Sequence, residues 1–431
     1  MTPPPEWKDK VSPYLKSMIG EDPIAKLLKF AGAEGVTAFS AGSPAPESFP
    51  LGKIRLLQSL ILLPPPLGYG KNLLQYGKDP RGFGPLLDRL PGFLDRDNRK
   101  VITKPENIIV TNGSQEALSL LGQVFLLQGD KVAVEKPTYI GALEALRPYN
   151  PNYIEIETDQ EGIKPDSLDK AFKENPDIKF LYTIPTFQNP TGKTMSLQRR
   201  QQIADVLKKW GQLAIEDDPY SELRYEGEPV PSLQSLAPDN VIHLFTFSKT
   251  MAPGLRVGGM VFPEGCDEIK KRVIKEIIAL TKRVQGGNKL SNPYILQAVV
   301  AKYLESGKLD NHIKKIIKLY KPRRDAMAQT IQENFPDIFD VSIPEGGMFI
   351  WLQLKKEFQY LALHLNLDEI ENELEKRKVA IAQGKYFFVN PETHEVSMRL
   401  NFTNQPIDKI VDGIRIIGEI LTEKLRAMDS K

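Results

Sequence analysis

The chain has 431 residues, and its 57 Lys and Arg side chains nearly balance its 55 Asp and Glu side chains, for a formal net charge of +2. That balance argues against a nucleic-acid-binding protein, which usually carries a clustered basic excess. The single cysteine, Cys266, excludes an internal disulfide, and no apolar run is long enough to be a signal peptide or a membrane span. We therefore expect a cytoplasmic protein without nucleic-acid or membrane partners.

Short apolar runs alternate with amphipathic stretches from about Pro105 onward. The apolar runs predict strands at 107–111, 131–135, 179–184, 212–216, 241–247 and 257–262. Between them, the pattern predicts one helix at 114–127, capped by Ser114, and another from a cap at Ser196 to about Trp210. Strands that alternate with helices indicate an α/β fold with a mostly parallel, helix-covered sheet, which binds ligands at the carboxyl ends of its strands.

The pattern changes after about Cys266. Helices are predicted at 267–283, 293–305 and 308–334, short strands return at 349–353 and 396–401, and a last helix starts at Ile407. This mixture predicts a second, smaller α+β domain.

Several common catalytic motifs are incomplete or absent. Gly192-Lys193-Thr194 resembles the end of a phosphate-binding loop, but Phe187 stands where that loop needs glycine. The sequence contains no Gly-x-Ser-x-Gly motif. The histidines lie far apart, without the spacing of metal ligands: His243, His312, His364 and His394. We therefore expect neither a nucleotide hydrolase, nor a serine hydrolase, nor a metal site.

The densest cluster of polar residues lies at 246–258, just past a predicted strand. Hydroxyl side chains at Thr246 and Ser248 flank Lys249, and Arg256 follows beside a Gly-Gly step. Lysine is the side chain that forms Schiff bases, while hydroxyls and arginine suit a phosphate dianion. A single lysine here is more often an ordinary surface residue, but the combination indicates an aldehyde-bearing phosphate cofactor, pyridoxal phosphate.

Two further strand ends fit this cofactor. Asn189 lies on an Asn-Pro-Thr-Gly turn after the strand at 179–184, and Asp217 follows the strand at 212–216. A buried carboxylate that pairs with the pyridine nitrogen keeps the ring protonated, which makes the cofactor a strong electron sink. Taken alone, each of these residues would more often cap a turn.

In these motifs the chain resembles the class I/II pyridoxal-phosphate-dependent aminotransferases of fold type I, in particular the kynurenine/aminoadipate and aromatic aminotransferase branch. The resemblance runs from about Ala38 to Arg399. The motifs occur in the family's order: Tyr76-Gly77, Asn112-Gly113-Ser114-Gln115-Glu116-Ala117, Pro137-Thr138-Tyr139, Asn189-Pro190-Thr191-Gly192, Asp217-Asp218-Pro219-Tyr220, Ser248-Lys249 with Arg256, Gly346-Gly347-Met348-Phe349, and Arg399.

The resemblance implies a division of the chain into three parts. A large cofactor-binding domain at 51–306 would contain a mostly parallel, seven-stranded sheet covered by helices. A small domain would follow at 307–431. The segment at 1–50 would pack against the small domain and the active site.

The resemblance also implies catalytic and cofactor-binding roles. Lys249, Asp217 and Tyr220 would be the catalytic residues. Lys249 would bind the cofactor covalently and move a proton at the substrate α-carbon, and Asp217 would pair with the pyridine nitrogen. Asn189 and Tyr220 would donate hydrogen bonds to the 3′ oxygen of the cofactor. The remaining side chains would stack on the ring or surround the phosphate: Tyr139 on the ring, and Ser114, Gln115, Ser248 and Arg256 around the phosphate.

Further roles concern the substrate and a second subunit. Arg399 would hold the substrate α-carboxylate with two parallel hydrogen bonds, close to Gly42 and Asn189. A tyrosine placed like Tyr76 reaches the phosphate of the neighbouring subunit in this family, so the active unit would be a homodimer.

The sequence departs from the family at two positions that bind acidic side chains. Aminoadipate-type members often carry Ser-Pro-Ile-Arg near the N-terminus, whereas this chain has Asp22-Pro23-Ile24-Ala25. Aspartate-specific members carry another arginine before a Ser-Asn-Pro turn, where this chain has about Gly287. Both departures favour an aromatic or large apolar amino donor.

We therefore expect an aminotransferase that moves an amino group between an L-2-amino acid and a 2-oxo acid such as 2-oxoglutarate, by a ping-pong mechanism. One alternative is another reaction on the same cofactor, β-elimination or decarboxylation, because the cofactor itself breaks the bonds. The other is a transcription regulator built on this fold, which would need a basic helix-turn-helix segment before the first motif at about Ala38.

Overall fold

The computed structural model describes residues 10–12, 15, 22–30, 32–97, 99–391 and 395–429. Most of the first 21 residues, which belong to the predicted N-terminal segment, and His394 lie outside this described part. Within it, no helix is long and apolar enough to span a membrane.

The larger of the two halves is built around a seven-stranded sheet. Its strands run in the order β2-β10-β9-β8-β7-β3-β4. All neighbouring pairs are parallel except those of β10, which is antiparallel to both β2 and β9. The sheet confirms the predicted fold class. Its strands are β2 (Ile108–Thr111), β3 (Lys131–Glu135), β4 (Asn152–Ile156), β7 (Phe180–Thr183), β8 (Ala214–Asp218), β9 (Val241–Thr246) and β10 (Gly258–Val261).

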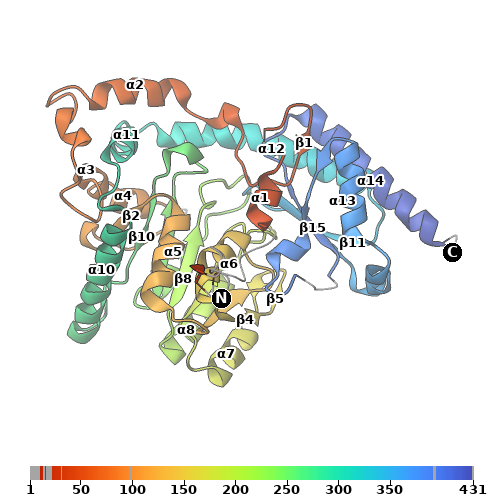
Figure 1. The fold of residues 1–431 in the computed structure, drawn as a ribbon, viewed down its shortest axis with the longest axis horizontal. Coiled ribbons are helices and arrows are strands. Elements are labelled where there is room, and N and C mark those ends of the chain that lie inside the picture. The colour runs from red at the N-terminus through yellow and green to blue at the C-terminus, as the bar shows by residue number, and fades with distance from the viewer. Residues whose placement is uncertain are drawn as a thin grey trace, which may run out of the picture.

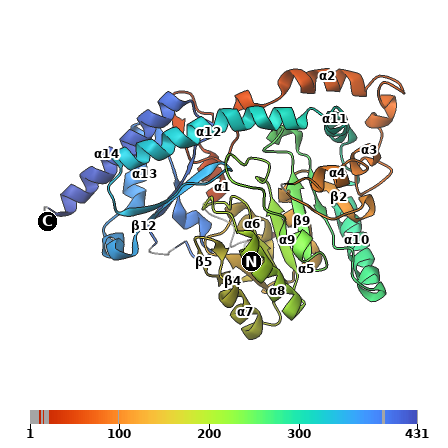
Figure 2. The same cartoon turned by 180° about the vertical axis from the view of Figure 1, so that it is seen from behind.

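Helices cover both faces of this sheet, which explains why its central strands are buried along their whole length. Every residue of β2, β7, β8, β9 and β10 is buried. One face carries α5 (Ser114–Phe125), α6 (Ile140–Leu146) and α10 (Glu268–Lys289), nearer the viewer in Figure 1. The other face carries α7 (Pro165–Glu174), α8 (Leu197–Trp210) and α9 (Leu233–Leu236), nearer the viewer in Figure 2.

The starts of two helices test the predicted caps. Ser196 caps α8 as predicted, since its side chain accepts a hydrogen bond from the backbone N–H of Arg199. The prediction that Ser114 caps α5 is wrong. Gly113 occupies the cap position with a φ of 80°, and Ser114 is the first helical residue. Because Gly113 has no side chain to act as a cap, the first N–H groups of α5 are left to other partners.

The smaller half contains a four-stranded antiparallel sheet in the order β11-β12-β15-β14. These strands are β11 (Phe339–Ser342), β12 (Phe349–Leu354), β15 (Ser397–Asn401) and β14 (Ala382–Gln383). Two helices of this half are α13 (Leu367–Lys376) and α14 (Ile407–Asp429). The long helix α12 (Leu309–Asn334) runs along the top of the molecule and joins the two halves (Figures 1 and 2). The domain boundary at 306/307 stays a prediction.

The first described helix lies between the two halves (Figure 1). Helix α1 (Pro23–Leu28) is followed by β1 (Thr37–Ala38), which pairs in parallel with β13 (Val379–Ala380) of the smaller half. The chain then enters the larger half, where α2 (Leu51–Ile61), α3 (Gly84–Leu87) and α4 (Leu90–Leu94) pack with α11 (Tyr294–Glu305) around one apolar cluster.

Several elements differ from the sequence prediction, and three of them show why. The edge strand β4 was not predicted, because its residues are half-buried and its first one, Asn152, is polar and exposed. Helix α13 was not predicted either, although its apolar positions Ile370 and Leu374 have helical spacing. Helix α10 continues to Lys289, beyond the predicted end at Arg283.

The end of β8 is fixed by a buried ion pair. The Nε of Arg99 lies 2.7 Å from the Oδ2 of Asp218, and its Nη1 lies 2.5 Å from the Oε1 of Glu222. Burial alone would raise the pKa of Asp218, but Arg99 and His243 hold it below its usual value. Arg99 is therefore the cation on which the buried carboxylate of Asp218 depends, whereas Glu222 also has Arg96 at 3.3 Å.

We expect Arg99→Met to destabilise the protein by about 3–5 kcal/mol, because the change leaves the buried carboxylate of Asp218 without its cation. The midpoint of urea denaturation, followed by circular dichroism, measures this loss. Arg272→Met is the control. Arg272 lies 3.9 Å from Glu276 in an exposed pair, which contributes less than about 1 kcal/mol. Equal midpoints for the two variants would contradict the role assigned to Arg99.

Candidate active site

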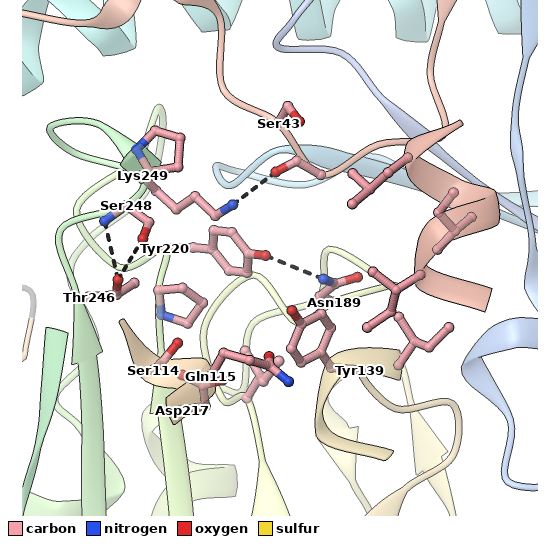
Figure 3. Close-up of a pocket in the computed structure, with 18 of the residues that line it drawn as sticks. Ser43, Ser114, Gln115, Tyr139, Asn189, Asp217, Tyr220, Thr246, Ser248 and Lys249 are labelled. Carbon is pink, nitrogen blue, oxygen red and sulfur yellow. Dashed lines mark hydrogen bonds between the residues drawn. The ribbon is translucent and has the colours of Figure 1, made fainter. Parts of the chain in front are cut away.

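A cavity of about 240 Å³ opens beside the carboxyl ends of β7, β8 and β9 (Figure 3). Every site residue predicted from the sequence lines this cavity except Tyr76. Those residues are Gly42, Ser114, Gln115, Tyr139, Asn189, Asp217, Tyr220, Ser248, Lys249, Arg256 and Arg399. Residues that are distant in the sequence thus meet where the topology of a parallel sheet brings strand ends together.

Asp217 lies near the end of β8 and is 2% exposed. Its Oδ2 accepts a hydrogen bond of 3.0 Å from the hydroxyl of Tyr182, a residue that the sequence analysis did not single out. Its Oδ1 is buried and has no hydrogen-bond partner among the described residues. Burial raises the pKa of Asp217 to about 7, against the lowering effect of Tyr182. Asp217 therefore offers one free oxygen to whatever occupies the cavity.

Lys249 follows β9 by a few residues. Its Nζ donates a hydrogen bond of 2.9 Å to the backbone carbonyl of Gly42 (Figure 3). Desolvation, and then the positive charges of Arg399 and Arg256, lower the pKa of Lys249 to about 8. A lysine with a lowered pKa supplies more of the neutral amine, which is the nucleophilic form.

One end of the cavity is built for an anion. Arg256 adopts the left-handed conformation, with a φ of 49°, and its Nη2 donates a hydrogen bond of 2.7 Å to the carbonyl of Asn112. This brings the guanidinium against the start of α5, where a Cβ on Gly113 would lie 2.6 Å from Nη2. Thr246 and Ser248 are hydrogen-bonded to each other beside it, 2.9 Å apart. Free helix N–H groups, hydroxyls and an arginine together suit a phosphate.

The opposite end is formed by Arg399, which lies in β15. Its Nη1 donates a hydrogen bond of 2.9 Å to the Oδ1 of Asn189, and its Nη2 donates one to the carbonyl of Ser40. The Nδ2 of Asn189 donates in turn to the hydroxyl of Tyr220, at 3.3 Å. Burial lowers the pKa of Arg399 to about 10, so its guanidinium stays charged at neutral pH.

Two aromatic rings lie against the Arg399 guanidinium. Its Cζ lies 4.2 Å from the ring centre of Phe349 and 4.8 Å from that of Phe387. Both rings are buried. Contact with two buried rings restricts the movement of the guanidinium and stabilises its charge. Phe387 lies outside every sequence motif and was not predicted.

The charges of the cavity do not balance. Among the described residues, its lining carries three cations, Lys249, Arg256 and Arg399, against the single carboxylate of Asp217. A cavity with this excess of positive charge favours an anionic ligand.

An apolar edge completes the cavity. Ile24, Leu27 and Leu28 reach it from α1, and Ile140 reaches it from the start of α6. The sequence analysis did not select these residues individually, but the spacing of 24, 27 and 28 after Asp22-Pro23 is that of one helix face. Asp22 caps this helix by accepting a hydrogen bond from the N–H of Ala25. The Lys26 ammonium lies 3.6 Å from the Oε2 of Glu371, on the small-domain side.

Tyr76 does not reach this cavity. Its side chain is 71% exposed on the surface of the larger half. Its predicted role across a subunit interface stays a prediction.

Comparison with known proteins shows which family this chain is similar to. The sequence profile described as aminotransferase class I and II matches residues 67–414. The chain is 37% identical over 408 residues to aromatic-amino-acid aminotransferase 1 of Thermococcus litoralis, covering 94% of this chain and 92% of that protein.

Solved structures of aminotransferases have the same fold as this chain. The kynurenine aminotransferase of Pyrococcus horikoshii superposes with a TM-score of 0.85 at 35% identity, over 97% of this chain and 98% of that one. LysN, the α-aminoadipate aminotransferase of Thermus thermophilus, complexed with N-(5'-phosphopyridoxyl)-L-leucine, gives a TM-score of 0.83 at 28% identity, over 98% of this chain and 100% of that one. The chain therefore belongs to the class I and II aminotransferases and is a pyridoxal-phosphate-dependent aminotransferase.

Proposed function

We propose that this aminotransferase takes its amino group from aromatic or large apolar L-amino acids and passes it to a 2-oxo acid such as 2-oxoglutarate, in a ping-pong cycle. The observation that carries the proposal is the shape of the cavity: a carboxylate-binding arginine, Arg399, faces the same space as the apolar side chains of α1. The similarity to an aromatic-amino-acid aminotransferase supports the same class of donor.

The cavity fits pyridoxal phosphate at three points. Asp217 presents a buried Oδ1 without a partner among the described residues, as the protonated ring nitrogen requires. Arg256 and the start of α5 form a cradle for the phosphate. Lys249 lines the same cavity, with a pKa lowered to about 8. When bound, the cofactor supplies an electron sink for the bonds at the substrate α-carbon.

The protein's own residues orient the substrate and move its proton. Arg399 holds the α-carboxylate with the edge of its guanidinium, while Asn189 keeps that edge in place. In the loaded enzyme, the amine of Lys249 would take up the proton of the substrate α-carbon and later release it. Tyr220 and Asn189, which are hydrogen-bonded to each other in the cavity, would donate to the 3′ oxygen of the ring.

We also propose that the active unit is a homodimer. Tyr76 is exposed, and apolar side chains near it in the sequence are exposed as well: Leu62, Leu63, Leu67 and Leu74. An exposed apolar surface of this kind is typical of a subunit contact. In such a dimer, Tyr76 would complete the phosphate site of the other subunit.

Borohydride reduction of the holoenzyme should attach the cofactor permanently to Lys249, because this is the only lysine among the described residues that line the cavity. Peptide mapping by mass spectrometry locates the label. Lys249→Ala should lower kcat by about a hundredfold to ten-thousandfold, as expected for the loss of a general acid–base group.

Lys193→Ala is the matched control, since Lys193 also has a pKa lowered by burial but bonds to the carbonyl of Asp159. A pyridoxyl label on any lysine other than Lys249 would refute the assignment.

Arg399→Lys should lower kcat/KM at least about tenfold for every amino donor, because each donor presents the same α-carboxylate and a lysine cannot reproduce a planar fork. The measurement is kcat/KM for phenylalanine, leucine, 2-aminoadipate and aspartate, with 2-oxoglutarate as acceptor. In the wild type, phenylalanine and leucine should exceed aspartate.

Arg323→Lys serves as the control, because Arg323 is buried but bonds to Glu47 and to the carbonyl of Thr403, outside the cavity. An Arg399→Lys penalty restricted to the acidic donors would show that Arg399 binds the side chain instead. Aspartate as the best donor would contradict the proposed substrate class.

Mixing two inactive variants tests the dimer. We expect Lys249→Ala and Tyr76→Ala to be defective separately and to regain activity when refolded together. In a mixed dimer, the site that keeps Lys249 receives an intact Tyr76 from the other subunit, so about one quarter of all sites should be of wild-type composition. Activity no higher than the sum of the separate variants would show that Tyr76 does not act across an interface.

A further inference from the structure

Tyr182 is a fully buried tyrosine whose hydroxyl points at Asp217. It lies on β7, next to β8, with its backbone in register with Ile215. Its side chain is 0% exposed and packs in the main apolar cluster, and it does not line the cavity. Its hydroxyl donates a hydrogen bond of 3.0 Å to the Oδ2 of Asp217. Among the described residues, the hydrogen bond of the Tyr182 hydroxyl goes to that carboxylate.

A buried tyrosine hydroxyl needs a partner, and phenylalanine would fill the same apolar space without that requirement. The one hydrogen bond that this hydroxyl makes among the described residues is its contact with Asp217, which is therefore the polar role we assign to it. We propose that Tyr182 is a positioning residue that holds one oxygen of the Asp217 carboxylate, so that the other oxygen faces the ring nitrogen of the cofactor. This inference rests on the proposed pairing of Asp217 with the cofactor.

The hydrogen bond fixes a torsion that is otherwise loose. Rotation of a carboxylate about its last side-chain torsion has broad minima, so an unheld Asp217 would sample several orientations. With Oδ2 held by Tyr182, the free oxygen is Oδ1, and this is the oxygen without a partner among the described residues. A carboxylate whose orientation is already fixed loses no orientational freedom when the cofactor binds. This favours binding of the cofactor.

The hydroxyl also favours the ionised carboxylate. Burial raises the pKa of Asp217 to about 7, and Asp218 raises it further, whereas the Tyr182 hydroxyl, His243 and Lys249 lower it. Burial keeps the pKa of Tyr182 itself well above its usual value, so this hydroxyl remains a neutral donor. Without the hydroxyl, the pKa of Asp217 rises, and the carboxylate is lost at a higher pH than in the wild type.

The test compares Tyr182→Phe with the wild type by dialysing the holoenzymes to equilibrium against pyridoxal phosphate at a series of pH values from about 5.5 to 9. A hydrogen bond to a charged group corresponds to about a tenfold to hundredfold change in affinity, so Tyr182→Phe should bind the cofactor more weakly by that factor. Its affinity should also begin to fall at a higher pH during acidification. Thermal denaturation is measured on the same samples.

Two controls separate the possible outcomes. Tyr153→Phe removes another tyrosine hydroxyl, which donates to the carbonyl of Leu143 away from the cavity, and should leave the affinity and its pH dependence unchanged. Asp217→Asn should weaken the binding of pyridoxal phosphate. It should also abolish the part of the pH dependence of this affinity that comes from titration of Asp217. If Tyr182→Phe lowers the melting temperature but keeps the wild-type affinity and pH profile, Tyr182 has only a structural role and the inference is wrong. If Asp217→Asn itself keeps the wild-type profile, the proposed pairing of Asp217 with the cofactor fails instead.

Discussion

Unbalanced charge in a largely desolvated cavity is the constraint on which this active site depends. Lys249, Arg256 and Arg399 face a single carboxylate among the described lining residues, that of Asp217, and charges removed from water need partners. The chain supplies backbone carbonyls to each cation, from Gly42, Asn112 and Ser40. These carbonyls hold the cations in place without neutralising them, so the cavity keeps the excess positive charge that a phosphate and a substrate carboxylate would offset.

The end of β8 shows how one strand separates reactive from structural carboxylates. Glu216 accepts hydrogen bonds from the N–H groups of Leu233 and Gln234 at the start of α9. Asp218 is paired with Arg99. Between them, Asp217 points into the cavity, because successive side chains of a strand alternate between its faces. A shift of one residue in this strand would exchange the ion-paired carboxylate for the free one, which explains why the buried partners of Glu216 and Asp218 matter for the site.

The sequence was informative wherever a site residue follows directly on an apolar strand. Lys249, Asp217 and Asn189 could be predicted because strand ends are recognisable and parallel strands bring them to one edge. Tyr182 and Phe387 could not, because a tyrosine inside a buried strand and a phenylalanine in the one-turn helix Gly384–Phe387 look like core residues until the fold places them against Asp217 and Arg399. The cap of α5 was misplaced by one residue because Ser114 has the preferred cap chemistry, whereas Gly113 has the required backbone conformation.

Strand β1 pairs with β13, so that Thr37 lies opposite Val379. This pairing affects the order in which the parts of the protein can fold during synthesis. A chain folds from its N-terminus as it leaves the ribosome. All strands of the large sheet are complete once Val261 has been synthesised, whereas β1 and the neighbouring Gly42 must wait for the last segment of the chain, which also carries Arg399. The half of the site that faces the cofactor can thus form during translation, and the half that faces the substrate closes only after synthesis has nearly ended.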